Sequence, residues 1–171
     1  MKSLRYILES FDTLYHFTHG RNLVNILKKD EFILSDTDYY NPEGWKYYMS
    51  LTRMSYAQTG YPITTWEDDV VRLVIDARAL FSRYKRITID TIKGKTVFPE
   101  SDPYYNGNVE AEERLLSNQK IIKKFHKYIK RIDINTNTIK AKDADDIIQY
   151  ADKLKIPVEV YDDDRLFNTA K

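Results

Sequence analysis

The chain has 171 residues, enough for one domain with a core of its own, and we expect residues 1–171 to form a single domain. Its 27 basic side chains are nearly balanced by 26 acidic ones, which excludes a bulk electrostatic attraction to nucleic acid or membranes. The absence of cysteine excludes disulfides, thiolate zinc sites and thiol nucleophiles, and it fits a cytoplasmic protein.

The first half of the chain is expected to contain short strands and two helices. Apolar and polar residues alternate over residues 13–17, which predicts a strand, and Leu23, Ile26 and Leu27 share one face of a helix over residues 22–29. The other expected elements are short extended pieces at 32–35 and 85–89, a turn-rich loop at 36–45, strands at 47–51 and 70–75, and a helical turn at 77–81.

The second half predicts a loop at 98–108, an acidic and then apolar segment at 109–118, a strand at 128–134, a helix at 144–154 and a last strand at 157–161. In that helix we expect Ile147, Ile148, Tyr150 and Leu154 to face the core. The whole pattern favours an α+β protein with a sheet of about six short strands and helices packed against it. We find no signal peptide and no apolar run long enough to span a membrane.

Two of the three histidines lie where the first strand meets the first helix. The segment Tyr15-His16-Phe17-Thr18-His19 precedes the helical residue Asn22. An imidazole at such a junction can hydrogen-bond a ligand, because it is neutral or charged near pH 7. The alternatives are a core histidine bonded to backbone for His16 and a residue at the helix start for His19.

Two further segments supply a cation and carboxylates. Met49-Ser50-Leu51-Thr52-Arg53 ends a strand in arginine, and Glu110-Ala111-Glu112-Glu113-Arg114 clusters three acids. These acids could form the first turn of a solvated helix, which its dipole would favour. In an extended segment, the Glu110 and Glu112 side chains would instead lie on one face.

The three segments together, over residues 14–116, resemble DarT-type toxins, which are ADP-ribosyltransferases that modify DNA bases using NAD. Residues 14–19, Asn22-Leu23 and Leu34-Ser35 are similar to the family's NAD pocket, and residues 49–53 are similar to its strand that ends in a cofactor-contacting arginine. The resemblance implies an ADP-ribosyltransferase-like split sheet. It also implies NAD binding by Tyr15, His16, Thr18, His19, Asn22, Ser35, Ser50 and Arg53.

The acidic segment carries the implied catalysis. Ala111-Glu112, followed by Leu115-Leu116, is similar to the family's segment with the catalytic glutamate, and other branches use the first acid of such a pair to position the acceptor. We therefore predict Glu112, assisted by Glu110 and Arg53, as the catalytic group. Glu113-Arg114 is more polar than the family pattern at that place, so the broader ADP-ribosyltransferase fold fits better than one subfamily.

The chemistry also follows from the residues themselves. Breaking the nicotinamide–ribose bond builds positive charge on the sugar, and a nearby carboxylate stabilises such an oxocarbenium-like transition state. Arg53 suits a pyrophosphate better than a lysine would, because its donors are planar. The sequence contains neither a Gly-x-Gly-x-x-Gly nor a Gly-Lys-Ser/Thr motif, so NAD would not be held in a Rossmann or P-loop manner.

We thus expect an NAD-dependent mono-ADP-ribosyltransferase whose acceptor is a nucleobase of DNA or RNA, or a protein side chain. Its richness in Lys, Ile, Asn and Tyr favours a bacterial or phage source, and a toxin or phage effector. The alternatives are an NAD glycohydrolase, an RNA 2′-phosphotransferase using Arg72, Arg78 or Arg83 for phosphate, or a non-catalytic binding protein. The oligomeric state is left open.

Two other charged clusters have simpler explanations. Asp143, Asp145 and Asp146 suit a helix N-terminus, and Asp162-Asp163-Asp164 an acidic turn, so we predict no metal site. Six basic residues surround His126, and they suggest either an exposed helix face or contacts with nucleic-acid phosphates; they are Lys120, Lys123, Lys124, Lys127, Lys130 and Arg131.

Overall fold

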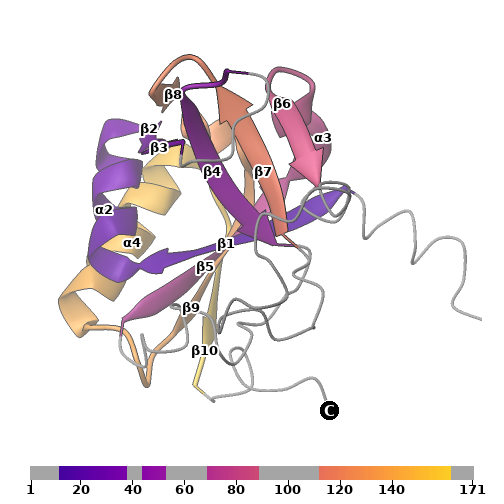
Figure 1. The fold of residues 1–171 in the computed structure, drawn as a ribbon. Helices are drawn as coiled ribbons and strands as arrows, with labels where there is room; N and C mark the ends of the chain where they lie inside the picture. The colour runs from indigo at the N-terminus through magenta and orange to yellow at the C-terminus, as the bar shows by residue number, and fades with distance from the viewer. Residues whose placement is uncertain (1–11, 38–43, 53–68, 89–111, 163–171) are drawn as a thin grey trace, which may run out of the picture.

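The computed structural model describes residues 12–37, 44–52, 69–88 and 112–162. Ten strands, two longer helices, one short helix and a 3₁₀ turn lie within these ranges (Figure 1). In chain order they are β1 (Thr13–His19), α2 (Gly20–Lys29), β2 (Glu31–Ile33), β3 (Ser35–Asp36), β4 (Tyr47–Thr52), β5 (Val70–Asp76), α3 (Ala77–Phe81), β6 (Lys85–Thr88), β7 (Glu112–Ser117), β8 (Ile121–Lys123), η3 (Phe125–Tyr128), β9 (Ile129–Asn135), α4 (Ala141–Leu154) and β10 (Val158–Tyr161).

The main sheet has the strand order β10-β9-β5-β1-β4-β7-β6, with β3 added beside β4. β1 pairs with β5 along its whole length of seven residues, whereas its register with β4 comprises one described pair, Tyr15 with Thr52. The sheet therefore divides between β1 and β4 into two parts, as the expected split sheet requires. β2 and β8 form a separate two-stranded sheet.

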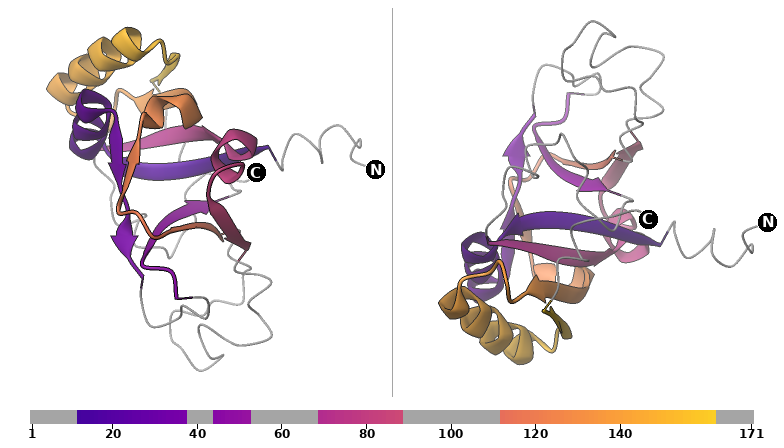
Figure 2. Two further views of the ribbon diagram at one scale, coloured as in Figure 1. Left: turned by 90° about the horizontal axis from the view of Figure 1, so that it is seen from above. Right: turned by 90° about the horizontal axis from the view of Figure 1, so that it is seen from below.

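Helices α2 and α4 pack side by side on one face of the β1-β5-β9 part, as Figures 1 and 2 show. Helix α2 presents Leu23, Val24 and Leu27 to the core, and α4 presents Ile147 between the small residues Ala144 and Ala151. The facing side of the sheet supplies fully buried side chains that complete this core, including Leu14, Leu73, Ile75, Ile132 and Ile134.

Helix α2 begins at a close approach between two backbones. The Gly20 amide donates to the Asp69 carbonyl oxygen at 2.8 Å, and a Cβ atom on Gly20 would lie 2.7 Å from the Asp69 Oδ1 atom. No other residue type fits there without displacing Asp69. The helix ends at Asp30, whose left-handed backbone (φ 52°) lets its amide donate to the Ile26 and Leu27 carbonyls.

The structure confirms the mixed α+β class but corrects several expected elements. The main sheet has eight strands, more than the six or so expected, because β3 has only two residues and β7 begins with three charged residues. The expectation of a helix face for the basic residues 120–131 was wrong, since they lie on β8, η3 and β9. Ile148 does not face the core: it is 43% exposed.

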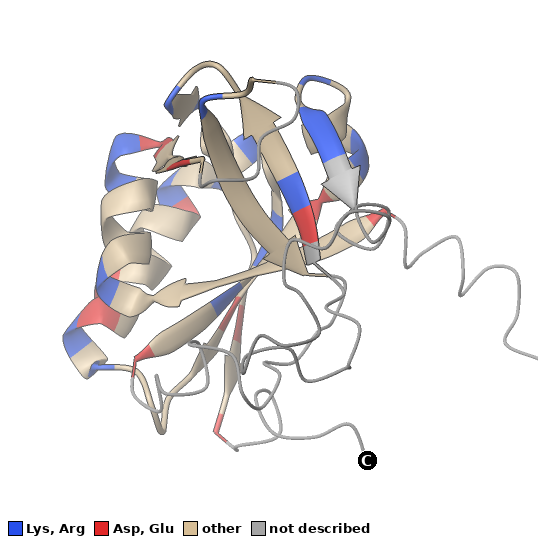
Figure 3. Cartoon of the chain, viewed as in Figure 1, with Lys and Arg blue, Asp and Glu red and all other residues tan. Residues whose placement is uncertain are grey.

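Charged positions lie on the strands of the main sheet as well as on the helices (Figure 3), and a buried ionic cluster joins the neighbouring strands β5 and β9. The Arg72 Nε atom donates to Asp133 Oδ2 at 2.7 Å, and Arg131 Nε donates to Asp133 Oδ1 at 2.6 Å. Since Asp133 is fully buried, the two guanidinium groups compensate its desolvation. Tyr161 donates to Glu159, which also pairs with Arg131.

Candidate functional site

The side chains of β1 point alternately to the two faces of the sheet, and this separates the predicted site residues. His16 and Thr18 belong to the row that faces the helices, and Tyr15 belongs to the opposite row. The His16 ring stands edge-on to Phe32 at 5.2 Å between centroids, while the Arg72 guanidinium lies 5.4 Å from the Tyr15 ring centroid. The Tyr15 and His16 side chains therefore leave β1 on opposite faces, and both remain predicted ligand contacts.

His16 is tied to the neighbouring strand. Its Nδ1 atom lies 2.9 Å from the Ser50 carbonyl oxygen, which can only accept, so Nδ1 carries the proton. Burial lowers the pKa of His16 below its ordinary value, and the hydrogen bond to Ser50 opposes this shift less strongly. At neutral pH the ring is thus neutral and leaves Nε2 as an acceptor, suited to a ligand hydroxyl.

The sheet register brings the three predicted segments together. Tyr15 pairs with Thr52, and Thr52 pairs on its other side with Glu112, the first residue of β7. Three predicted features therefore lie on adjacent strands at one level of the sheet. They are Tyr15 on β1, the end of β4 just before Arg53, and the start of the acidic strand β7. Arg53 and Glu110 lie outside the described residues, as does the side chain of Glu112.

Glu113 is distinct from its neighbours. It pairs with Leu51 in the register, is 1% exposed, and accepts from Arg86 Nε at 2.9 Å. The hydrogen bond from Arg86 to Glu113 is the main cause that raises the pKa of Arg86. Because Glu113 is committed to this buried ion pair, it is a poor candidate for the catalytic acid. Among the three clustered glutamates, Glu110 and Glu112 therefore remain the predicted catalytic pair.

A groove of about 430 Å³ runs along α2 beside β1 and β2. Two predicted residues, Thr18 and Asn22, line its walls; the others are Asn25, Ile26, Lys29, Glu31, Phe32 and Ile33. His16 contacts it through Phe32. We did not predict Asn25 and Lys29, although Asn22, Asn25, Ile26 and Lys29 follow the spacing of one helix face and could have been found from it.

The remaining predicted residues lie outside this groove. Ser35 is exposed on β3 opposite Tyr48. The Ser50 carbonyl accepts the hydrogen bond from the His16 ring. His19 is the N-cap residue of α2, in extended backbone, and makes no side-chain capping bond. Both serines and His19 remain predicted ligand contacts.

Two of the three arginines considered for phosphate transfer pair with carboxylates, and the third, Arg83, is exposed. Arg72 is paired with buried Asp133, and the Arg78 Nη2 atom lies 2.9 Å from Asp12 Oδ2. In the part of the chain that the structure describes, no three His, Asp or Glu side chains gather as a metal site. Within the same ranges, no helix has the length and apolar character needed to cross a membrane.

A divided sheet with paired helices on one face and a groove beside β1 defines the fold class as an ADP-ribosyltransferase-like fold. Solved structures of DarT from Thermus sp. 2.9 have this same fold. The complex with NAD+ has 12% sequence identity and a TM-score of 0.55, covering 92% of this chain and 98% of that one.

Two further DarT complexes give the same result. The complex with carba-NAD+ has 13% identity and a TM-score of 0.55, with 92% and 98% of the chains covered. The complex with ADP-ribosylated ssDNA has 12% identity, a TM-score of 0.56 and coverage of 92% and 97%. No family model and no curated protein matches the sequence. The resemblance to DarT is thereby confirmed at the level of the fold.

Proposed function

We propose that this chain is an NAD-dependent mono-ADP-ribosyltransferase. The observation that carries the proposal is the register of Tyr15, Thr52 and Glu112 across β1, β4 and β7, next to a groove lined by Thr18 and Asn22. The fold shared with DarT bound to NAD+ supports NAD as the substrate. The complex with ADP-ribosylated ssDNA supports a nucleobase, ahead of a protein side chain, as the acceptor.

The proposed residues divide the work by their chemistry. The neutral His16 accepts a hydrogen bond from a ribose hydroxyl at Nε2, while Thr18 and Asn22 bond the polar edge of the same substrate. Arg53 pairs with the pyrophosphate through its planar donors. Tyr15, His19, Ser35 and Ser50 are proposed as outer contacts.

In the reaction, the bond between the ribose C1′ and the nicotinamide nitrogen breaks and nicotinamide leaves with the bonding electrons. The Glu112 carboxylate stabilises the positive charge left on the ribose. The acceptor atom, positioned by Glu110, then forms the new bond to C1′ and gives its proton to the Glu112 carboxylate. Excluding water from this step separates a transferase from a glycohydrolase.

The test is nicotinamide release from NAD by the purified chain, followed by chromatography. We expect Glu112→Gln to lower the rate about 10²- to 10⁴-fold, the usual contribution of a positioned acid or base. Asp145→Asn, at an exposed site on α4, is the control and should release nicotinamide normally. Normal turnover by Glu112→Gln would show that the catalytic residue is misassigned.

Mass spectrometry of DNA, RNA and protein incubated with the chain and NAD identifies the acceptor. An added ADP-ribose mass on a nucleobase is the expected product. Nicotinamide release without any adduct would instead identify an NAD glycohydrolase. Binding of NAD without release would identify a non-catalytic binding protein.

A further inference from the structure

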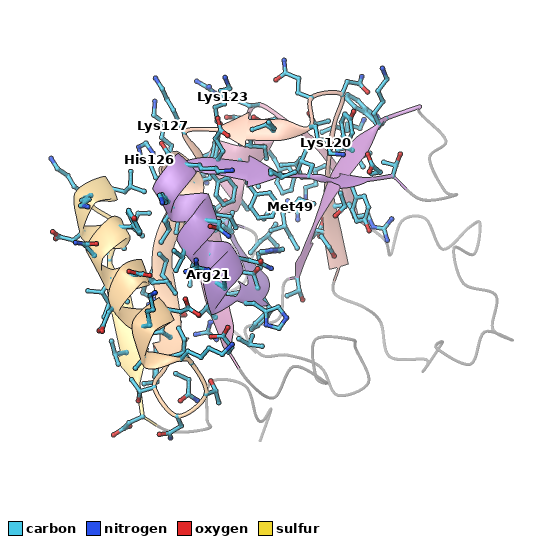
Figure 4. All side chains as sticks on the ribbon, turned by 90° about the vertical axis from the view of Figure 1, so that its left-hand side faces the viewer. Arg21, Met49, Lys120, Lys123, His126 and Lys127 are labelled. Atoms are coloured by element: carbon cyan, nitrogen blue, oxygen red, sulfur yellow. The ribbon has the colours of Figure 1, made fainter. Side chains whose placement is uncertain are left out.

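Five exposed lysines gather at one end of helix α2, and we refer to them as the lysine corner: Lys28, Lys29, Lys123, Lys124 and Lys127. Figure 4 shows Lys123 and Lys127 beside His126 at this end of the helix, with Arg21 and Lys120 lying elsewhere. Two carboxylates, those of Asp30 and Glu31, lie next to these five lysines in the structure. The positive excess of these residues is larger than the net charge of +1 of the whole chain, so the other residues together are net acidic.

Hydrogen bonds hold the two halves of the lysine corner together. The Asp30 carboxylate accepts from the His126 amide at 2.9 Å and lies 2.7 Å from His126 Nδ1. The Phe125 amide donates to the Asp30 carbonyl at 3.2 Å. Lys123 on β8 is the backbone register partner of Glu31 on β2. The end of α2 and the β8–η3 turn are therefore one rigid surface, although 96 residues separate Asp30 from His126.

Structural roles explain only part of this charge. The dipole of α2 favours Lys28 and Lys29 in its last turn. It does not account for Lys123, Lys124 and Lys127, which lie on other elements. No lysine of the corner forms an ion pair with a residue that the structure describes, whereas Lys120 pairs with Asp36 at 3.3 Å. Lys124 also has a left-handed backbone (φ 54°), a conformation that glycine and asparagine adopt at a lower energetic cost than lysine.

We propose that the lysine corner is a docking surface for the phosphate backbone of a single-stranded nucleic acid. Lys29 belongs both to the corner and to the wall of the groove, so a strand held at the corner reaches the groove that begins at Thr18 and Asn22. That the docked strand is also the acceptor rests on the proposed function, while binding itself does not.

The surface beside the corner favours nucleic acid over other anionic partners. Ile33 and Ile121 pair across β2 and β8 and are 58% and 38% exposed, next to the row that holds Lys123. A strand of nucleic acid offers phosphates to the lysines and flat base faces to the isoleucines. Two isoleucines are a small apolar area for insertion into a bilayer, whose peripheral binding needs a larger apolar face.

The test is binding of a fluorescent single-stranded oligothymidine to the full chain, measured by anisotropy at several salt concentrations without NAD. Each phosphate contact contributes about −0.7 to the slope of log K against log salt for single strands. The triple variant K123Q/K124Q/K127Q should therefore lose about two units of this slope and bind about tenfold more weakly at low salt.

The control is K140Q/K142Q/K155Q, which removes three exposed lysines around α4, one of them left-handed like Lys124. It should bind as the unaltered chain does. Should the first variant fold poorly by circular dichroism, K28Q/K127Q replaces it, because it leaves the left-handed position intact. Equal loss in both variants, or no loss in either, would overturn the proposal.

Vesicles of phosphatidylserine form a second arm. Loss of vesicle binding with unchanged oligothymidine binding would assign the lysine corner to a membrane and would also overturn the proposal. Failure of the proposed function has a different signature, because it would remove nicotinamide release while oligothymidine binding and its dependence on the corner persist.

Discussion

The Nδ1 atom of His16 on β1 lies 2.9 Å from the carbonyl oxygen of Ser50 on β4, at the seam between the two parts of the sheet. Beside it, the described register between these strands is the single pair of Tyr15 and Thr52. One imidazole thus links the two parts of the sheet through Nδ1, while its Nε2 atom is left as an acceptor. This double role makes His16 sensitive to protonation.

We expect stability to fall on acidification because of His16. Its folded-state pKa is lowered by burial, so the unfolded chain binds the proton more readily. The stabilising contribution is complete above the unfolded pKa, about 6.5, and is lost as pH falls from there toward the lowered folded value. His16→Asn keeps a donor near the Ser50 carbonyl without titrating. Urea unfolding at several pH values should show that the difference in the free energy of unfolding between wild type and H16N changes in that window. A constant difference would contradict the expectation.

The pair of Arg86 and Glu113 should contribute to stability without contributing to catalysis. Arg86→Met removes the guanidinium that compensates the buried Glu113 carboxylate and should cost about 2–3 kcal/mol, less than a fully buried pair would, since Arg86 is partly exposed to water. Adding Glu113→Gln removes the buried charge, so the double variant should be more stable than R86M alone. Denaturant titration measures both, with the exposed Arg83→Met as control. A double variant less stable than R86M would contradict this account.

The groove wall should determine the affinity for NAD. Asn22→Ala removes one neutral hydrogen bond, which contributes about 1 kcal/mol, so we expect KM for NAD to rise about five- to tenfold with kcat little changed. Asn25→Ala should act in the same direction. Gln149→Ala, exposed on α4, is the matched control for loss of an amide. A fall in kcat at constant KM would place Asn22 in the chemical step instead.

Glu110 should affect transfer more than cleavage. If it positions the acceptor, Glu110→Gln will slow the formation of ADP-ribosylated product by about 10²-fold or more while nicotinamide release continues toward water. The ratio of nicotinamide to adduct, measured on the same samples, reports this directly. An equal fall of both products would mean that Glu110 acts in breaking the glycosidic bond.

Local patterns predicted the elements whose burial follows from nearby residues. The apolar run of β5, the helical turn at residues 77–81 and the amphipathic face of α2 were all expected. Strand β7 was obscured by its charges: Glu113 is compatible with a buried strand because Arg86, 27 residues earlier, neutralises it. Likewise β8 and η3 are short and depend on distant partners: β8 pairs with β2, and η3 is held by Asp30. The lysine-rich sequence therefore did not indicate an extended segment.

The sequence likewise predicted only part of the candidate site. The register between Tyr15, Thr52 and Glu112 agrees with grouping the three segments, which came from their order in the sequence and the family resemblance. Alternation along β1 could have separated Tyr15 from His16, but the pocket was expected to use both. The far wall of the groove depends on how α2 lies against β2, which no local pattern of residues 20–33 specifies.

The absence of a side chain at Gly20 allows the first residue of α2 to lie against another backbone segment. Because its amide meets the Asp69 carbonyl, and the Asp69 amide in turn meets Thr138, the start of α2 is pinned to the chain that precedes β5. A side chain at this position would first have to displace the Asp69 carboxylate, whose Oδ1 atom lies 2.7 Å from where the Cβ atom would be. Asn22 and Asn25 follow on the same helix, so the anchor at its first residue also fixes where the polar wall of the groove begins.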